Sequence, residues 1–234
     1  MRNPIATLIV VLICTIASVG AGGCNSKPPP EIDSAVRKRL ARYSQAWQQG
    51  DAGGVRESFH ARDAGEIELL EALAELAPAQ AELQKAYQES LGSVGRILFS
   101  GTDADELVIN ARQWDSFARS AANPHRLIYK KPIVIAQLHE KDDETSLHLR
   151  PVDGQWKIDL DALLMGDAAP ELAQAAQREV AHTKELTDAI RSGDTSRVRQ
   201  VVLRQVIEVR GPARRVIEDV LATRPTTRAK ENPP

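Results

Sequence analysis

Histidine and aspartate side chains are the first residues of this sequence that could do chemistry. The five histidines are His60, His125, His139, His148 and His182. No two stand four residues apart, the spacing at which two side chains on one helix face share a metal ion. His139 and His148 could lie diagonally on one face of a β-hairpin, where His148 would face Asp159. A metal site would need a third ligand, and a solvated face would not tune an acid–base pair. We therefore interpret His139 and His148 as a pair of surface residues, and we predict no metal site.

Other recognisable catalytic motifs are missing from the sequence. It holds no G-x-S-x-G elbow, no phosphate-binding glycine loop and no Cys-x-x-Cys pair. The net charge is −2, so the chain as a whole has no large field to attract nucleic acid. These features predict no catalytic residue, no cofactor and no nucleic-acid partner.

The N-terminus has the three-part form of an export signal. Arg2 supplies a positive charge, and the run from Ile5 to Val19 is apolar and uncharged. That run is shorter than the ~20 residues that a membrane-spanning helix needs. Four small residues, Gly20-Ala-Gly-Gly23, then precede Cys24. This end resembles the lipobox of bacterial lipoproteins, in which a peptidase cuts before a cysteine whose thiol carries a diacylglycerol.

The lipobox resemblance implies lipidation of Cys24 and a membrane anchor without a spanning helix. Lipoboxes usually have Leu three residues before the cysteine, where this chain has Ala21. Ordinary secretory cleavage after Ala21, leaving Cys24 as a free thiol, is the alternative. Asn25 stands where an inner-membrane retention signal often has Asp, which by resemblance points to the outer membrane. Ser26–Pro30 is expected to be a short stiff tether.

Apolar residues recur at spacings of three and four after the tether, which predicts helices. The first helix covers Glu31 to Gln49. Gly50-Asp51 would end it and cap a short helix over Val55–Phe59. Asp63 to Leu91 is the longest helical stretch, and Pro78 predicts a kink or break within it. Between Gly101 and Ala122 the pattern is mixed, with a short strand or a helix possible.

Three strands are predicted next, over Ile133–His139, Ser146–Arg150 and Gln155–Leu160, because apolar and polar residues alternate there. A first turn centred on Asp142-Asp143 would place Leu138 opposite Leu147 and Ala136 opposite Leu149. A second turn at Asp153-Gly154 would place the following pairs opposite each other: Leu149 and Ile158, Leu147 and Leu160, and Pro151 and Trp156. These side chains share one face, which we expect to be buried. The opposite face is expected to be exposed to solvent, except at the start of the first strand, where Ile133 and Ile135 fall on it and a helix could cover them. The polar residues of this face are Gln137, His139, Ser146, His148, Arg150, Lys157 and Asp159.

The C-terminal region reads as two helices separated by Ser192-Gly193-Asp194, where Gly-Asp repeats the earlier Gly50-Asp51. The first ends near Arg191, and the second covers Thr195 to Val209, breaks at Gly211-Pro212 and resumes to Leu221. The second helix carries a stripe of small apolar side chains with arginines around it. The stripe is Val202, Val206, Val209, Ala213, Val216 and Val220. It could bind a partner, or it could pack on the main domain with arginines facing the acidic Asp63–Leu91 segment.

The element order resembles the NTF2-like superfamily, in its bacterial lipoprotein-type branch. The residues that carry the resemblance are Ala46-Trp47 with Gly50-Asp51, and Asp153-Gly154 with Trp156-Lys-Ile-Asp159. The resemblance covers about Glu31 to Leu163. It implies an α+β cone in which N-terminal helices pack on a curved antiparallel sheet of three to four strands. Enzymes of this family that act as ketosteroid isomerases use a buried Asp and a Tyr. Here the candidates would be Asp159 or Asp161 with Tyr43, Tyr87 or Tyr129.

These observations predict five segments and a function class. The segments are a signal peptide over residues 1–23, the lipidated Cys24 and tether over 24–30, the NTF2-like domain over 31–165, a helical extension over 166–222 and a disordered tail over 223–234. We expect a lipid-anchored protein facing the periplasm that binds an envelope protein or a small apolar ligand without catalysis. The alternatives are an isomerase or dehydratase with a buried carboxylate base, and an assembly module acting through the C-terminal helices.

Overall fold

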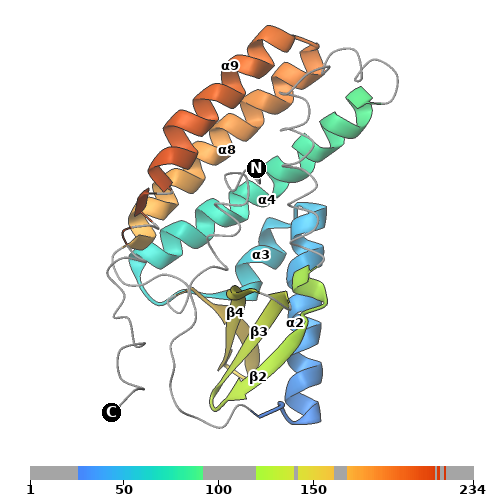
Figure 1. The fold of residues 1–234 in the computed structure, drawn as a ribbon, viewed down its shortest axis with the longest axis vertical. Coiled ribbons are helices and arrows are strands. Elements are labelled where there is room, and N and C mark those ends of the chain that lie inside the picture. Colours follow the sequence, from blue (N-terminus) through green and yellow to red (C-terminus); the bar gives the residue numbers. More distant parts are fainter. Residues whose placement is uncertain are drawn as a thin grey trace, which may run out of the picture.

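The computed structural model describes residues 26–91, 120–139, 142–160, 168–213, 215–216 and 219. Its helices are α2 (Pro30–Gln49), α3 (Ala52–Ser58), α4 (Ala64–Leu91), α8 (Ala168–Ser192), α9 (Thr195–Gln205) and the π-helix η1 (Val206–Arg210). Its strands are β1 (Phe59–His60), β2 (Arg126–Lys130), β3 (Ile133–His139), β4 (Asp142–Val152) and β5 (Gln155–Asp159). The fold is α+β, and the strands form one mixed sheet in the order β1-β5-β4-β3-β2. The sheet and the start of α2 lie at one end of the long axis, and α8 and α9 reach the other end (Figure 1).

The turn between α2 and α3 follows the local chemistry of Gly50 and Asp51. Gly50 has φ 67°, and its N–H and that of Asp51 donate to carbonyls in the last turn of α2. The Asp51 carboxylate then accepts a hydrogen bond from Gly54 N at 3.0 Å and caps α3. The predicted stop and cap are confirmed. However, α3 begins three residues earlier than predicted, and Phe59 belongs to β1.

The β4–β5 hairpin has the predicted register. Asp153 and Gly154 occupy the two-residue turn with φ values of 50° and 75°, as a type I′ turn requires. Leu149 lies opposite Ile158, and Pro151 lies opposite Trp156. Because a two-residue turn fixes which residues face each other, this part of the sheet was predictable from the sequence.

The β3–β4 hairpin differs from its predicted register by two residues. Ala136 lies opposite Leu147 rather than Leu149, and His139 pairs with Asp142. Asp142 and Asp143, predicted as the centre of the turn, therefore belong to β4, and the register shifts between Gln137 and His139. A shift of two residues keeps every side chain on its predicted face, so the apolar face is still the buried one.

The sheet has more strands than the predicted three or four, and it is mixed rather than antiparallel. β2 extends it beyond β3, and the two-residue β1 pairs with β5 in parallel, Phe59 opposite Ile158 and His60 opposite Asp159. Two residues carry no readable alternation, so only the long-range pairing with β5 defines β1.

The second face of the sheet is less exposed than predicted: Gln137, His148, Arg150 and Lys157 are partly exposed, whereas two predicted surface residues are buried, and Ile135 lies in the corner that was expected to be covered. Ser146 and Asp159 are each only 1% exposed on this face, and Ile128 and Ile135 are 8% exposed. Alternation along a strand separates its two faces, but it does not show whether something covers the second face.

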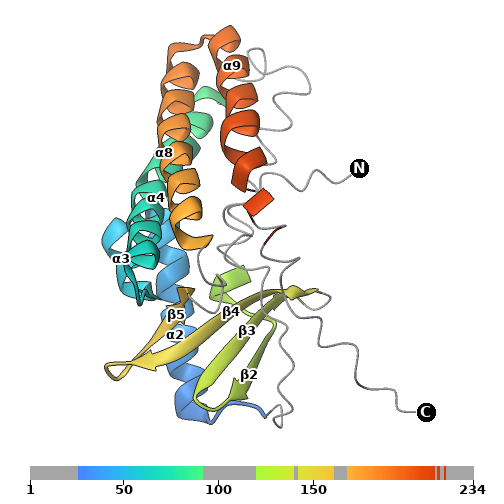
Figure 2. The ribbon, with the colours of Figure 1, turned by 90° about the vertical axis from the view of Figure 1, so that its left-hand side faces the viewer.

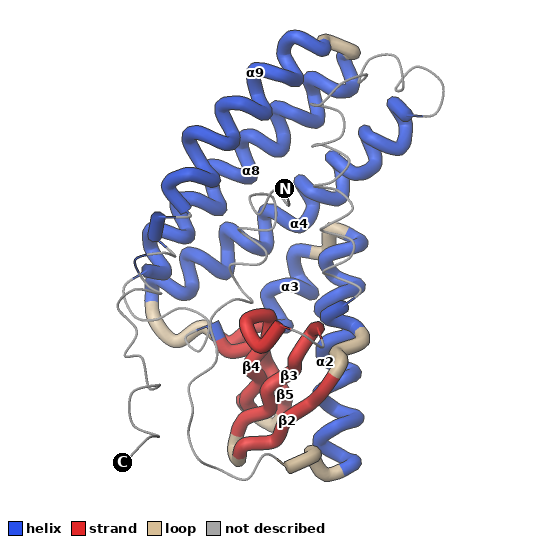
Figure 3. The backbone as a smooth tube through the Cα atoms, viewed as in Figure 1, coloured by secondary structure: helices blue, strands red, loops and turns tan. Residues whose placement is uncertain are grey.

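Helices α4, α8 and α9 lie along one another and form a helical arm (Figures 2 and 3). Pro78 lies inside α4 without ending it, so of the predicted kink or break, the break is wrong. Packing against α8 along its length holds α4 together despite the ~3 kcal/mol that an interior proline costs. Gly211-Pro212 does not break the last helix either, because η1 leads directly into helical residues 211–213. A wider π turn accommodates a proline that lacks an N–H and crowds the preceding turn.

The valine stripe packs within the molecule. Val202 is buried against a satellite core formed by the ends of α4 and α8, Val209 and Ala213 are buried as well, and Val216 packs against the main core. Two of the arginines beside the stripe meet α8: Arg204 donates to Glu185 at 2.6 Å, and Arg197 Nε lies 3.9 Å from Glu185 Oε1. The alternative in which the stripe packs within the molecule is therefore correct for these residues. The acidic partner of Arg197 and Arg204, however, lies on α8 and not on the acidic α4. Val220 lies outside the described residues.

Candidate functional site

The junction between β1 and α4 places a charged side chain on the sheet. The Asp63 carboxylate accepts a hydrogen bond from Glu66 N at 2.9 Å, and Glu66 Oε2 accepts one from Arg62 N at 2.6 Å. These reciprocal caps satisfy N–H groups at and just before the first turn of α4. Glu66 is only 4% exposed, so the side chain that accepts the hydrogen bond from Arg62 N is buried. Arg62 is thereby fixed beside the closing strand β5.

Asp159 is the centre of a buried ion cluster. Arg62 Nη2 donates to both carboxylate oxygens of Asp159, at 3.1 and 3.0 Å. The Nε of Arg150 forms a second ion pair with Asp159 Oδ2. The two arginine side chains are 36% and 34% exposed, whereas the aspartate side chain is 1% exposed. One buried carboxylate therefore holds two partly solvated guanidinium groups.

This geometry makes Asp159 a structural counter-ion rather than a catalytic base. A general base needs a carboxylate oxygen within hydrogen-bond reach of a substrate proton. Both oxygens of Asp159 are already bound by guanidinium groups in charge-assisted contacts. The cluster instead ties β4 and β5 to the start of α4.

The predicted tyrosine–aspartate pair is not formed by the described residues. Tyr43 lies in the core, with its ring 6.3 Å from Trp47 and 5.4 Å from Phe59 in edge-to-face contacts. That core lies on the face of the sheet that Ile158 joins, opposite the Asp159 face. Tyr129 is on the far edge strand β2, and Tyr87 lies near the far end of α4. Asp161 lies outside the described residues.

The histidine pair keeps only part of its predicted arrangement. Extending the β4–β5 register by one residue beyond Leu149 and Ile158 puts His148 opposite Asp159, as predicted. The side chain of His139 lies outside the described part of the chain. Within that part, no group of three His, Cys, Asp or Glu residues could hold a metal ion.

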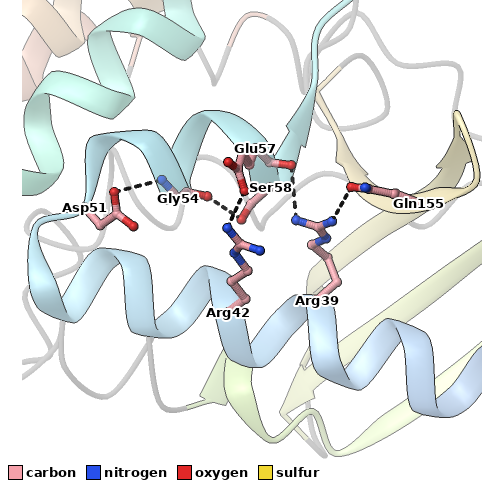
Figure 4. Close-up of polar contacts among 7 residues, drawn as sticks. All are labelled: Arg39, Arg42, Asp51, Gly54, Glu57, Ser58 and Gln155. Atoms are coloured by element: carbon pink, nitrogen blue, oxygen red, sulfur yellow. Dashed lines mark hydrogen bonds and ion pairs between the residues drawn. The ribbon is translucent and has the colours of Figure 1, made fainter.

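Arg39 and Arg42 of α2 form a polar network with the end of α3 and the β4–β5 hairpin (Figure 4). Arg39 donates to the Glu57 carbonyl at 3.3 Å and to Gln155 Oε1 at 2.8 Å, and Arg42 donates to the Glu57 carboxylate. Partial burial, followed by the neighbouring charge of Arg42, lowers the pKa of Arg39 from its ordinary value. This network fixes the hairpin on α2, so we interpret it as structural.

A groove of about 370 Å³ lies between the start of α3, the middle of α4 and α8. Its lining combines small apolar side chains with charges of both signs: Ala52, Glu75, Pro78, Ala79, Glu82, Lys184, Thr187, Asp188 and Arg191. Arg191 donates to Glu82 at 2.5 Å across it. That hydrogen bond lowers the pKa of Glu82 and raises the pKa of Arg191. No motif marks the groove in the sequence, because its walls come from segments about a hundred residues apart.

A second pocket, of about 400 Å³, lies where the first described residues meet the sheet edge. It is lined by Lys27, Asp33, Arg37, His125, Arg126 and Leu127. Ser26 lies beside it and forms an isolated antiparallel bridge with Tyr129 of β2. Sequence reasoning missed this pocket too, since it singled out none of these side chains as a cluster.

Comparison with known proteins gives no relative for this chain. No protein-family model, no curated protein and no solved structure matches it. Among the described residues, no helix is both long enough and apolar enough to cross a bilayer. Cys24, the predicted lipidation site, lies outside the described residues.

Proposed function

We propose that this chain is a lipid-anchored protein of the cell envelope that faces the periplasm, at the outer membrane, and binds a protein partner without catalysing a reaction. The anchor would be attached at Cys24, after removal of residues 1–23. The globular part would be an NTF2-like domain that carries the helical arm.

The element order supports the NTF2-like assignment. A helix, a Gly-Asp turn and a short helix precede a strand meander that ends in the Asp153-Gly154 hairpin and β5. Helix α2 packs on the apolar face of this meander, as the family cone would require.

The position of the groove between α4 and α8 is the observation that carries the binding proposal. The arm that holds it extends away from the end of the molecule where Ser26 meets the sheet (Figures 1 and 2). A chain anchored just before Ser26 would therefore hold the arm away from the bilayer. The apolar floor at Pro78 and Ala79 and the charged rim suit a partner segment with one apolar face and charges of both signs.

Two observations favour a protein partner over the other candidate functions. In an NTF2-like cone an apolar ligand pocket would lie between the helices and the sheet, and here that face of the sheet is packed with fully buried side chains, among them Tyr43, Leu147 and Ile158. A small apolar ligand would have to displace them. The carboxylate that an isomerase would use as its base, Asp159, is bound by Arg62 and Arg150.

The binding proposal can be tested by photo-crosslinking in living cells. A photoreactive residue at Lys184 lies on the groove, whereas one at Gln177 is exposed two turns earlier on the same helix, outside it. We expect a discrete crosslinked protein from position 184 and none from 177. Equal adducts at both positions, or none at 184, would contradict the proposal.

The anchor is tested separately by metabolic labelling with a radioactive fatty acid. The wild-type chain should incorporate the label, and a Cys24→Ala variant should not. If neither protein is labelled, the lipobox interpretation is wrong, whatever the crosslinking shows.

A further inference from the structure

The first described residues dock on the sheet edge. Ser26 O accepts a hydrogen bond from Tyr129 N at 2.8 Å, and Pro28 is buried. The segment expected to be a tether, Ser26–Pro30, therefore contacts the fold from its first residue. Cys24 precedes Ser26 by two residues, and an extended chain covers at most about 3.5 Å per residue. The Cα atom of Cys24 thus lies within about 7 Å of that of Ser26.

The pocket beside this contact is basic. It brings together Lys27, the guanidinium groups of Arg37 and Arg126, and the imidazole of His125. Its one carboxylate, Asp33, accepts a hydrogen bond from Arg37 Nε at 2.8 Å. Within the described part of the chain, neither Lys27 nor Arg126 forms an ion pair with an acidic residue.

The same end of the molecule carries further positive charge. Lys130 and Lys131 directly follow Tyr129, where β2 turns towards β3. Glu31, in the first turn of α2, is the acidic residue nearest in the chain besides Asp33. Within the described segments 26–37 and 125–131, five cations (Lys27, Arg37, Arg126, Lys130 and Lys131) therefore stand against two carboxylates (Glu31 and Asp33).

We propose that this pocket binds the phosphate group of an anionic phospholipid in the membrane that holds the Cys24 anchor. The proposal rests on the anchored state proposed above, because only a lipid at Cys24 brings the pocket to the bilayer. The headgroup layer is roughly 5–8 Å thick on each side of the hydrocarbon core, comparable to the reach of two residues. Guanidinium and ammonium groups are the side chains that bind phosphate oxygens best. The pocket would then fix the orientation of the domain on the membrane.

The test measures how fast Lys27 reacts with an acetylating reagent, read by mass spectrometry and normalised to Lys184 in the same molecule. The full chain, purified from cells in a neutral detergent, is reconstituted into vesicles of phosphatidylcholine, with or without phosphatidylglycerol. A third sample stays in detergent micelles and receives inorganic phosphate. We expect slower acetylation of Lys27 only in vesicles that contain phosphatidylglycerol.

The Arg126→Glu variant should lose this protection. Each cation removed weakens binding to an anionic surface by about fivefold. The matched control is Arg178→Glu, which makes the same charge change on the exposed side of α8 and should keep the protection. Loss of protection in both variants would mean that only net charge matters, and would overturn a pocket.

Three outcomes separate the possible sources of phosphate. Protection by phosphatidylglycerol alone supports the lipid headgroup. Protection by inorganic phosphate in micelles, with no difference between the two kinds of vesicle, would overturn the headgroup assignment in favour of a soluble phosphate. No protection in any sample would overturn the site. If fatty-acid labelling fails while phosphate protects Lys27 in micelles, the anchor proposal is wrong and the pocket itself still binds phosphate.

Discussion

Arg62 Nη2 lies 3.0 Å from Asp159 Oδ2, although the two residues are 97 positions apart in the chain. The contact joins the segment just before α4 to β5, the last strand along the chain. Since the carboxylate is buried and Arg150 pairs with it as well, one aspartate connects three elements of the fold.

The Asp159→Asn variant should be less stable than the wild type. It leaves Arg62 and Arg150 without their counter-charge, and partial solvation of both arginines limits the cost to about 1–3 kcal/mol. Urea unfolding followed by circular dichroism measures it. Asp153→Asn is the control, because that side chain is exposed and Asn tolerates the positive φ of the turn. Equal midpoints for both variants would show that the cluster contributes nothing to stability.

Two glycines of similar conformation should respond differently to alanine. Gly50 (φ 67°) and Gly154 (φ 75°) both lie in the left-handed region, so each substitution costs about 1–2 kcal/mol in the backbone. At Gly50 a Cβ would also lie 2.9 Å from Ala81 Cβ and from Pro78 Cα, whereas at Gly154 nothing lies within 4 Å. Gly50→Ala should therefore lose about 1–3 kcal/mol more than Gly154→Ala in the same unfolding assay. A smaller loss at Gly50 would mean that α2 and α4 can separate without cost.

Substitutions in β5 should destabilise the protein on one face of the strand only. Ile158 is fully buried, so Ile158→Ala should cost about 2–5 kcal/mol, depending on how far the core collapses around the cavity. Lys157, the preceding residue, is on the other face and only partly buried, and Lys157→Ala should change stability by less than about 0.5 kcal/mol. Thermal unfolding of both variants checks this difference. A large effect at Lys157 would argue against the observed register.

Acid should weaken the link between α4 and α8. The hydrogen bond from Arg191 lowers the pKa of Glu82, so the folded state favours the ionised carboxylate. This contribution is present at neutral pH, above the ordinary carboxyl pKa of about 4.3, and is lost as the pH falls through the lowered value. The stability difference between the wild type and Glu82→Gln should be small, because the pair is exposed, and should disappear in acid. A difference that grows as the pH falls would contradict this sign.

Local features of the fold were predictable because neighbouring residues decide them. Gly50 and Asp51 form the stop and the cap that their types favour, and Gly193 and Asp194 repeat the same arrangement between α8 and α9. The β3–β4 register was not predictable, because the irregularity between Gln137 and His139 has no signature in the alternation. Neither pocket could be predicted, since each gathers side chains from distant segments.

Residue patterns were enough to predict where the described helices lie, apart from the breaks expected at Pro78 and Gly211-Pro212, together with three of the five described strands and the buried face of the sheet. All of these depend on periodicity or on residue types a few positions apart. The burial of Asp159 could not be predicted from its strand, because its partner Arg62 comes from the loop before α4, far away in the chain. A strand pattern shows which way a side chain points, but only the packing of distant segments determines what it meets there.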